Sequence, residues 1–156
     1  MKTLIVYASK YGCVKKCCEE IRLKLNGDLD IVDIDKVGDV NLTIYNNIII
    51  GCSVYIGSVQ KSIKNFCKKN LSLLLNKSMS LFVCCLFEDQ LNDVLAKNFP
   101  AELLEHAKSI KSFKGEIKYE KLQLLDKVAY KALAKTMDLD CEINYKAVNE
   151  FLADIL

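Results

Sequence analysis

The feature that most constrains this chain is residues 2–16, where an uncharged run is followed at once by a helical pattern. The run Leu4–Ala8 is rich in strand-favouring residues, which predicts a strand buried on both faces. After a short polar turn at Ser9–Gly12, apolar residues recur at helical spacing from Val14 to Leu25. A buried strand that leads through a tight turn into a helix is typical of a central strand in a parallel sheet.

The turn after this strand has the properties of an anion site. A helix N-terminus presents free backbone N–H groups, and the helix dipole favours negative charge there. Gly12 allows close approach of the backbone, Ser9 supplies a hydroxyl and Lys10 a positive charge. The P-loop and dinucleotide-binding signatures are absent, because no other glycine precedes Gly27. The alternative is a strand–helix junction that binds nothing.

Composition indicates one globular domain spanning residues 1–156. Hydrophobic residues make up 51% of the chain and charged residues 27%, which excludes a disordered chain. A net charge of +2, without a basic stripe interleaved with aromatics, argues against nucleic acid as a partner. No apolar run approaches transmembrane length, so we expect a protein that is not transmembrane. The N-terminal residues do not resemble a signal peptide, and we expect a cytoplasmic location.

The chain contains eight cysteines. Their spacing fits neither a zinc-binding pattern nor a redox C-x-x-C pair, so the sequence predicts no metal site. Several lie on apolar faces, where a reduced thiol behaves as a small hydrophobic group. Cys13 is the exception, since a cysteine at a helix N-terminus can have a lowered pKa. Its alternative interpretation is an inert loop residue.

Strand and helix patterns alternate along the rest of the chain. Strands are predicted at Leu29–Ile34, Asn47–Ser53, Met79–Phe87 and Ile110–Ile117, and helices at 59–75, 92–98, Ala101–Ala107 and Leu122–Met137 and after Asn144. Five alternations predict a doubly wound α/β fold with five parallel strands in the order 2-1-3-4-5. The two charged strands should lie at the edges. Loops after the first and third strands, at Ser9–Val14 and Ser53–Ser58, should then line a ligand crevice.

Two stretches of the chain resemble a known family. The turn Ser9–Val14 is similar to the phosphate loop of flavodoxins, [ST]-x-[ST]-G-x-[ST], although Tyr11 and Val14 replace two hydroxyl residues. The run from Ile48 to Gly57 resembles the third strand and following loop of flavodoxin-domain proteins that include menaquinone-dependent protoporphyrinogen oxidase. The helix pattern Ser62–Lys69 is also similar to that group, as is the carboxyl-terminal order of a Gly115-containing strand, an extra helix around Leu122–Met137 and a last helix. The resemblance therefore covers essentially the whole chain and implies a three-layer flavodoxin-like fold that binds FMN.

The same resemblance implies roles for individual residues. The FMN phosphate would be held by Ser9, Lys10, Tyr11, Gly12, Cys13 and Val14. The ribityl chain and one edge of the flavin would lie beside Ser53, Val54, Tyr55, Ile56 and Gly57, and the other edge would face the loop from Phe87. Tyr55 would stack on the flavin or hydrogen-bond near it, or else be a surface aromatic. His106, the only histidine, is expected to be a surface or packing residue.

The leading hypothesis is therefore an FMN-binding redox protein. It acts either as an electron carrier for a redox partner protein or as a protoporphyrinogen-oxidase-like enzyme that passes electrons to a quinone. No catalytic acid or base can be named for the second mechanism. The alternative is a regulatory or interaction domain that has lost FMN, motivated by Tyr11 and Val14. A receiver-type signalling domain is excluded, because Ser9 and Ser53 stand where that class requires acids.

The carboxyl-terminal third carries a segregated positive charge. Residues 108–135 hold eight lysines and three acids, a local balance of +5. The predicted helix in this segment also has an apolar stripe, formed by Leu122, Leu125, Val128, Ala129 and Leu133. Such a helix suits peripheral contact with an acidic partner or an anionic membrane. The alternative is an ordinary helix packed on the sheet with a solvated lysine face.

Overall fold

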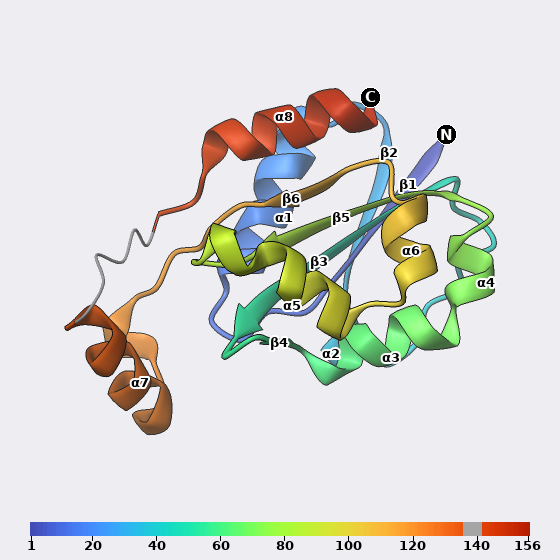
Figure 1. The fold of residues 1–156 in the computed structure, drawn as a ribbon. Helices are drawn as coiled ribbons and strands as arrows, with labels where there is room; N and C mark the ends of the chain where they lie inside the picture. The colour runs from blue at the N-terminus through green and yellow to red at the C-terminus, as the bar shows by residue number, and fades with distance from the viewer. Residues whose placement is uncertain (136–141) are drawn as a thin grey trace.

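The computed structural model describes residues 1–135 and 142–156, arranged as a central sheet between two layers of helices (Figure 1). Strands are β1 (Lys2–Tyr7), β2 (Asp28–Asp33), β3 (Asn47–Tyr55), β4 (Ser58–Val59), β5 (Ser78–Cys84) and β6 (Ile110–Ser112). Helices are α1 (Cys13–Lys24), α2 (Ile34–Val37), α3 (Lys61–Lys69), α4 (Leu71–Leu74), α5 (Leu91–Asn98), α6 (Ala101–His106), α7 (Leu124–Ala134) and α8 (Tyr145–Ile155). The end of the predicted helix at Met137 lies outside the described residues, as does Cys141.

The sheet has the order β2-β1-β3-β5-β6 with all of these strands parallel, which confirms the predicted doubly wound flavodoxin-like fold. β3 pairs with β1 on one side and with β5 on the other. Its loop therefore lies between the loops that follow those two strands. The charged strands β2 and β6 are at the edges, as expected.

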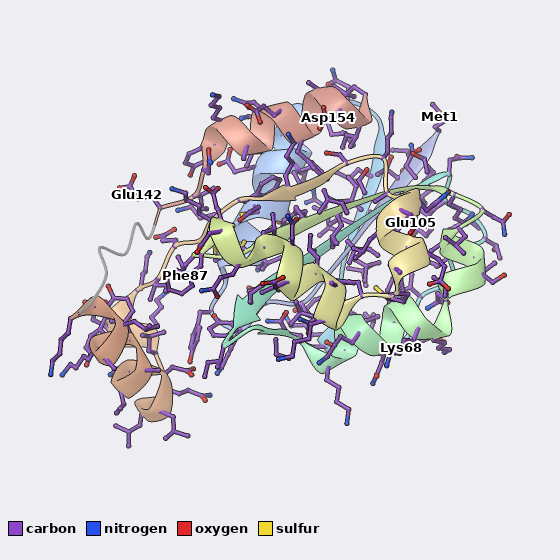
Figure 2. The ribbon with its side chains drawn as sticks, viewed as in Figure 1. Met1, Lys68, Phe87, Glu105, Glu142 and Asp154 are labelled. Atoms are coloured by element: carbon purple, nitrogen blue, oxygen red, sulfur yellow. The ribbon has the colours of Figure 1, made fainter. Side chains whose placement is uncertain are left out.

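Side chains alternate along the central strands and divide the core in two. Leu4 and Val6 of β1 face one layer, with α2 to α6, whereas Ile5 and Tyr7 face α1 and α8. Both helix layers are visible in Figure 1, and side chains fill the space between them and the sheet (Figure 2). A strand buried on both faces reads as a continuous apolar run, which explains why periodicity located the central strands correctly.

Element ends differ from the prediction where backbone geometry intervenes. β6 stops at Ser112 rather than at Ile117, because Lys114 has a φ of 55° and turns the chain out of the ladder. The predicted helix over 59–75 is divided at Asn70, whose side-chain amide donates to the Phe66 carbonyl oxygen at 3.0 Å. The loop expected at 54–58 is partly a hairpin, since β4 pairs antiparallel with the end of β3.

Helix α7 stands away from the sheet (Figure 1) and has no buried residue. The predicted apolar stripe is divided. Leu122 is 8% exposed and, together with Ala129 and Leu133, lines a cavity, whereas Leu125 is 83% exposed and Val128 62%. The alternative of a helix packed on the sheet is therefore wrong. Among the described residues, no helix has both the length and the apolar character to cross a membrane.

Candidate functional site

A cavity of about 500 Å³ lies at the carboxyl ends of β3 and β5, beneath α7. Its wall is formed by residues 53–57 at the end of β3 and the following turn, 84–87 at the end of β5, 114–117 after β6, and the inner side of α7. Cys13, Gln90, Val94 and Leu122 complete it. Phe87, one of the predicted residues, lies between α5 and α7 (Figure 2). The lining is mostly apolar, with polar groups from Ser53, Gln90, Lys114, Glu116 and Asp126. A concave apolar site with few polar groups at a sheet switch point is typical of a small-molecule site.

The loops after β1 and β3 meet beside this cavity, as the strand order predicted. The rings of Tyr11 and Tyr55 make an edge contact with centroids 5.7 Å apart. The ammonium of Lys10 lies 5.2 Å from the Tyr11 ring centroid and 5.0 Å from that of Tyr55. Burial raises the pKa of Tyr55, so its hydroxyl stays protonated. A second hollow of about 280 Å³ adjoins the same place and is lined by Lys10, Asp35, Tyr55, Val59 and Gln60.

Gly12 begins α1 in a conformation that suits glycine. Its φ is 89°, and a Cβ atom there would find nothing within 4 Å, so the backbone faces open space. Its N–H donates to the Ser9 hydroxyl at 3.0 Å. No side chain caps the helix and no acid lies in its first turn. The N–H groups of this first turn, which no side chain caps, can therefore donate hydrogen bonds to an anion.

Asp126 of α7 reaches across to the same loop. Its carboxylate accepts hydrogen bonds from the Lys10 ammonium at 2.6 Å and from the Tyr11 hydroxyl, and the Gln123 N–H donates to that hydroxyl at 3.1 Å. These bonds, that from Lys10 foremost, lower the pKa of Asp126. The loop after β1 thus serves as the attachment point of α7.

The hairpin between β3 and β4 is strained at its tip and clamped at its base. Ile56 has a φ of 49°, which is uncommon for a β-branched residue, and its side chain is 89% exposed at the cavity. At the base, the buried Asn98 side chain accepts from the Val59 N–H at 3.2 Å and donates to the Gly57 carbonyl at 2.9 Å. The Gln60 side-chain oxygen accepts a hydrogen bond from the Ser53 N–H at 3.2 Å, and the Gln60 amide group donates one to the Ser53 hydroxyl at 2.5 Å. The hairpin therefore holds an exposed, strained residue at the edge of the cavity.

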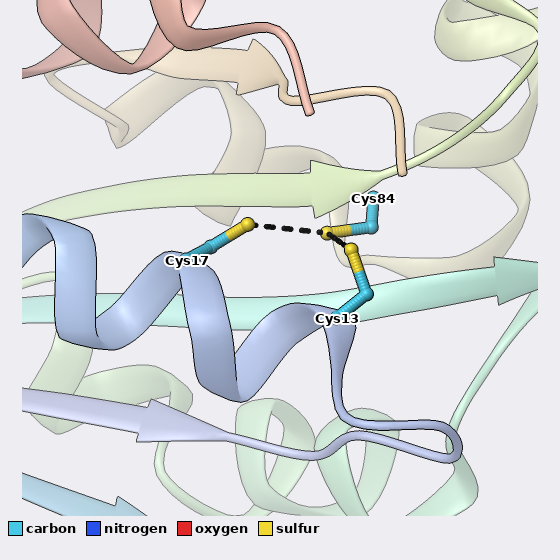
Figure 3. A group of neighbouring side chains, drawn as sticks. All are labelled: Cys13, Cys17 and Cys84. Atoms are coloured by element: carbon cyan, nitrogen blue, oxygen red, sulfur yellow. Dashed lines mark hydrogen bonds between the residues drawn. The ribbon is translucent and has the colours of Figure 1, made fainter. Parts of the chain in front are cut away.

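Three thiols gather below the cavity: those of Cys13, Cys17 and Cys84 (Figure 3). The Cys13 sulfur lies 3.6 Å from that of Cys84 and accepts a hydrogen bond from the Glu116 N–H at 3.2 Å. Hydrogen bonding with the Cys17 and Cys84 thiols lowers the pKa of Cys13, while the pKa values of these two partners are raised.

The structure divides the predicted site residues into two groups. Those on the cavity wall are Cys13, Ser53, Val54, Tyr55, Ile56, Gly57 and Phe87. The others, Ser9, Lys10, Tyr11, Gly12 and Val14, do not line it. Val14 is fully buried against the sheet, so its side chain cannot reach a ligand from solvent. His106 is remote from the cavity, as expected, and its ring nitrogen pairs with the Lys77 carbonyl oxygen.

Sequence reasoning missed part of the cavity wall. The missed residues come from the segment after β6 and from α7, and include Lys114, Glu116, Ile117, Asp126 and Tyr130. Periodicity assigned the first of these segments to a strand and the second to an amphipathic helix. The backbone turn at Lys114 brings the segment after β6, and with it α7, over the carboxyl ends of the strands. The predicted helix at Leu122–Met137, which lies between the last strand and the last helix of the chain, was the available signal.

Solved structures with a similar fold are known. No curated protein sequence matches the chain. Among solved structures, a flavodoxin from Streptococcus pneumoniae TIGR4 is 14% identical, with a TM-score of 0.56 over 99% of this chain and 97% of the other. A WrbA-like flavodoxin from Agrobacterium tumefaciens is also 14% identical, with a TM-score of 0.54 over 99% of both chains. These likenesses support the fold.

A third structure contains a ligand. It is a flavoprotein from Lactobacillus acidophilus NCFM in complex with FMN, 18% identical to this chain, with a TM-score of 0.51 over 71% of this chain and 92% of the other. The family profile described as "Flavodoxin domain" matches residues 4–140, which is most of the chain. The specific resemblance to the protoporphyrinogen oxidase group is not established by these matches. On the profile match and the sheet order together, the chain belongs to the flavodoxin-domain family.

Proposed function

We propose that this protein binds one FMN without a covalent bond and transfers electrons through it. The observation that carries the proposal is the meeting of the open turn at Gly12 with a largely apolar cavity at the ends of β3 and β5. A phosphate and a flat ring need these two environments side by side. The Lactobacillus acidophilus flavoprotein, which shares the fold, was solved with FMN. When bound, the flavin supplies the redox chemistry, and the protein supplies binding and orientation.

The residues present fit the phosphate end of this cofactor. The N–H groups of the first turn of α1 would donate to the phosphate, since no side chain caps them. Ser9 adds a hydroxyl, and Lys10 adds a charge that it shares with the Asp126 carboxylate at 2.6 Å. The two hydroxyls missing from the family pattern matter less than they would in a loop that binds through side chains. Val14 packs into the core and would contribute its backbone N–H alone.

The residues around the cavity fit the ring. Tyr55 and Ile56 lie on the hairpin that Asn98 holds in place, and Phe87 comes from the opposite loop. The Cys13 side chain also lies on this wall.

Titration of the apoprotein with FMN tests the proposal. We expect quenching of flavin fluorescence at one equivalent and a rise in melting temperature that grows with FMN concentration. Gly12→Val should weaken binding about 100-fold, because about two charge-assisted hydrogen bonds to the phosphate are lost. Gly38→Val is the matched control, since Gly38 also has a positive φ, 74°, and open space around it, but lies at the end of α2.

The outcomes separate the hypotheses. Absence of quenching and of thermal stabilisation in the unmodified protein would favour the alternative, a regulatory domain without FMN. Equal loss of affinity in both glycine variants would show that backbone strain, rather than the phosphate contact, is responsible.

A quinone as electron acceptor is the second candidate, favoured by one observation. Ala129 and Leu133 of α7, with Leu122 shortly before the helix, lie over the cavity. A flat apolar molecule could enter there, whereas a protein partner would have to reach the ring past α7. Reoxidation of the reduced protein by a short-chain quinone should therefore be faster than by a small redox protein at equal concentration. Three further expectations stay predictions. They are a redox partner protein, a cytoplasmic location, and peripheral membrane contact through Leu125 and Val128.

A further inference from the structure

The thiols of Cys13, Cys17 and Cys84 form a triangle that the proposed redox role does not require. Cys13 and Cys17 lie one turn apart on the same side of α1, and Cys84 ends β5 (Figure 3). All three sulfur atoms lie within 4.8 Å of one another. The sequence predicted no metal site because no local spacing pattern is present; the third sulfur comes from a strand 67 residues after Cys17.

The separations between these sulfur atoms match those around a metal ion. The Cys13 and Cys17 sulfurs lie 3.6 and 3.8 Å from that of Cys84. Zinc–sulfur bonds of about 2.3 Å place the sulfurs of a tetrahedral site about 3.8 Å apart, and those of a planar trigonal site about 4.0 Å apart. A disulfide requires about 2.05 Å and would join only two of the three. The two distances from the Cys84 sulfur therefore suit one tetrahedral ion, and the Cys13 and Cys17 sulfurs lie within 4.8 Å of each other.

One of the three sulfurs accepts a backbone hydrogen bond, and two of the three cysteines line the cavity. Cys17 and Cys84 are buried, while Cys13 is half-buried on the cavity wall, where the Glu116 N–H donates to its sulfur. A backbone donor of this kind orients and stabilises a thiolate ligand. The Glu116 carboxylate is already paired with the Lys16 ammonium at 2.6 Å, so it does not compete for the ion. Cys13 and Cys84 both line the cavity, so an ion held by these sulfurs would lie at its wall.

Other buried thiols in the described part of the chain do not share this arrangement. Cys18, Cys52 and Cys67 are fully buried, and none belongs to such a group. They fit the interpretation of thiols as small hydrophobic residues. Burial alone therefore does not explain why three sulfurs from α1 and β5 converge at the cavity.

We propose that Cys13, Cys17 and Cys84 bind one Zn²⁺ ion, with its fourth position open to the cavity. Thiolates select borderline and soft cations such as Zn²⁺, and three protein ligands with one open position are typical of zinc sites that take a water or a small ligand. The site does not depend on FMN, because its ligands are the protein's own and it can load in the apoprotein.

The first experiment uses the unmodified, reduced, flavin-free protein. Zn²⁺ is titrated against a chromophoric chelator, and X-ray absorption of the loaded protein counts the sulfur neighbours. We expect one ion per chain, with three sulfurs at about 2.3 Å. Failure to compete for Zn²⁺, or fewer than three sulfur neighbours, would overturn the proposal, and so would a Cys13–Cys84 disulfide that persists under reducing conditions. FMN binding is measured separately, so its failure leaves this result unaffected.

The second experiment compares matched serine variants. Cys13→Ser, Cys17→Ser and Cys84→Ser should each weaken Zn²⁺ binding by about 100-fold or more, because loss of a mere supporting residue already costs 10–100-fold. Cys67→Ser is the control for a buried thiol, and Cys141→Ser for the thiol outside the described residues; both should bind as the unmodified protein does. Cys13→Ser is decisive if the buried variants unfold, since this side chain is half-exposed. Unchanged binding in Cys13→Ser, or equal loss in Cys67→Ser, would refute the assignment.

Discussion

Helices α1 and α7 are nearly equal in length, at 12 and 11 residues, and both carry an apolar stripe, yet they are held in opposite ways. The stripe of α1 is completely buried between the sheet and α8. α7 buries no residue and is attached by polar contacts, chiefly through Asp126. The comparison teaches that periodicity identifies a helix and its apolar face but not what covers that face.

The physical reason lies in how each helix is connected. α1 follows β1 through a tight turn and leads into a neighbouring parallel strand, so a right-handed crossover returns it to the sheet. α7 follows the segment that leaves the sheet at Lys114, and no strand succeeds it in the described chain. Nothing in its connections forces its outer face against the core.

Truncation of isomeric apolar side chains should show the largest difference between the two helices. Ile21→Ala in α1 removes a fully buried side chain and should lower the free energy of unfolding by about 3 kcal/mol, because it leaves a cavity. Leu125→Ala in α7, at a side chain 83% exposed, should change it by less than about 0.5 kcal/mol. Urea denaturation of both variants provides the measurement. Similar losses would mean that α7 is covered in solution.

A second test concerns the tight packing of the sheet. A Cβ atom on Gly51 would lie 2.4 Å from the Phe82 ring, which stacks on Phe113 with centroids 4.7 Å apart. Gly51→Ala should therefore lower the free energy of unfolding by about 2 kcal/mol through overpacking. Gly27→Ala, with open space around it, is the control for added side-chain volume, although its positive φ adds strain. Thermal denaturation that leaves Gly51→Ala as stable as the unmodified protein would contradict the rigid core.

In the hairpin at the cavity, by contrast, a substitution should stabilise the protein. Ile56→Asn should raise the free energy of unfolding by about 1 kcal/mol, because Asn tolerates positive φ and Asn-Gly suits this two-residue turn. If Ile56 contacts the flavin, the same variant should bind FMN more weakly. Stability is measured by denaturation of the apoprotein and affinity by fluorescence quenching. Val128→Asn in α7 is the control for loss of an exposed apolar side chain. A stability equal to or below that of the unmodified protein would show that Ile56 is not strained.

The smallest expected effect on global stability comes from detaching α7. Asp126→Asn removes its ion pair with Lys10 and should cost less than about 1 kcal/mol, because solvent screens the pair. Amide hydrogen exchange in α7 should nevertheless become faster, while exchange in α1 is unchanged. Glu120→Gln provides a control for charge removal in the same segment.

Acidification should reproduce that detachment. The pKa of Asp126 is lowered in the folded protein, so its contribution is fully present above the carboxyl's unfolded value of about 3.9 and is lost as the pH falls through the lower folded value. After correction for the intrinsic exchange rate, amide exchange in α7 should therefore stay constant near neutral pH. It should become faster only in acid, where Asp126 is protonated and α7 is released. Release near pH 6 would point to another group.

Much of the candidate site followed from strand order. Once the uncharged runs were placed at the centre, the loops after β1 and β3 had to meet, and the contact between Tyr11 and Tyr55 confirms that they do. The part contributed by α7 could not be predicted in this way. Its position depends on the backbone turn at Lys114 and on Asp126 meeting Lys10, a pair separated by 116 residues.

By itself the sequence determined the alternation of elements, the double burial of the central strands and the family to which the chain belongs, because these depend on local patterns of apolar and charged residues. Only the tertiary structure decided which side chains from distant elements converge: Cys84 with Cys13 and Cys17, and Asp126 with the loop after β1. Those meetings depend on how strand ends and turns align in space. No local pattern encodes that alignment, since residues far apart in the chain become neighbours only when the sheet forms.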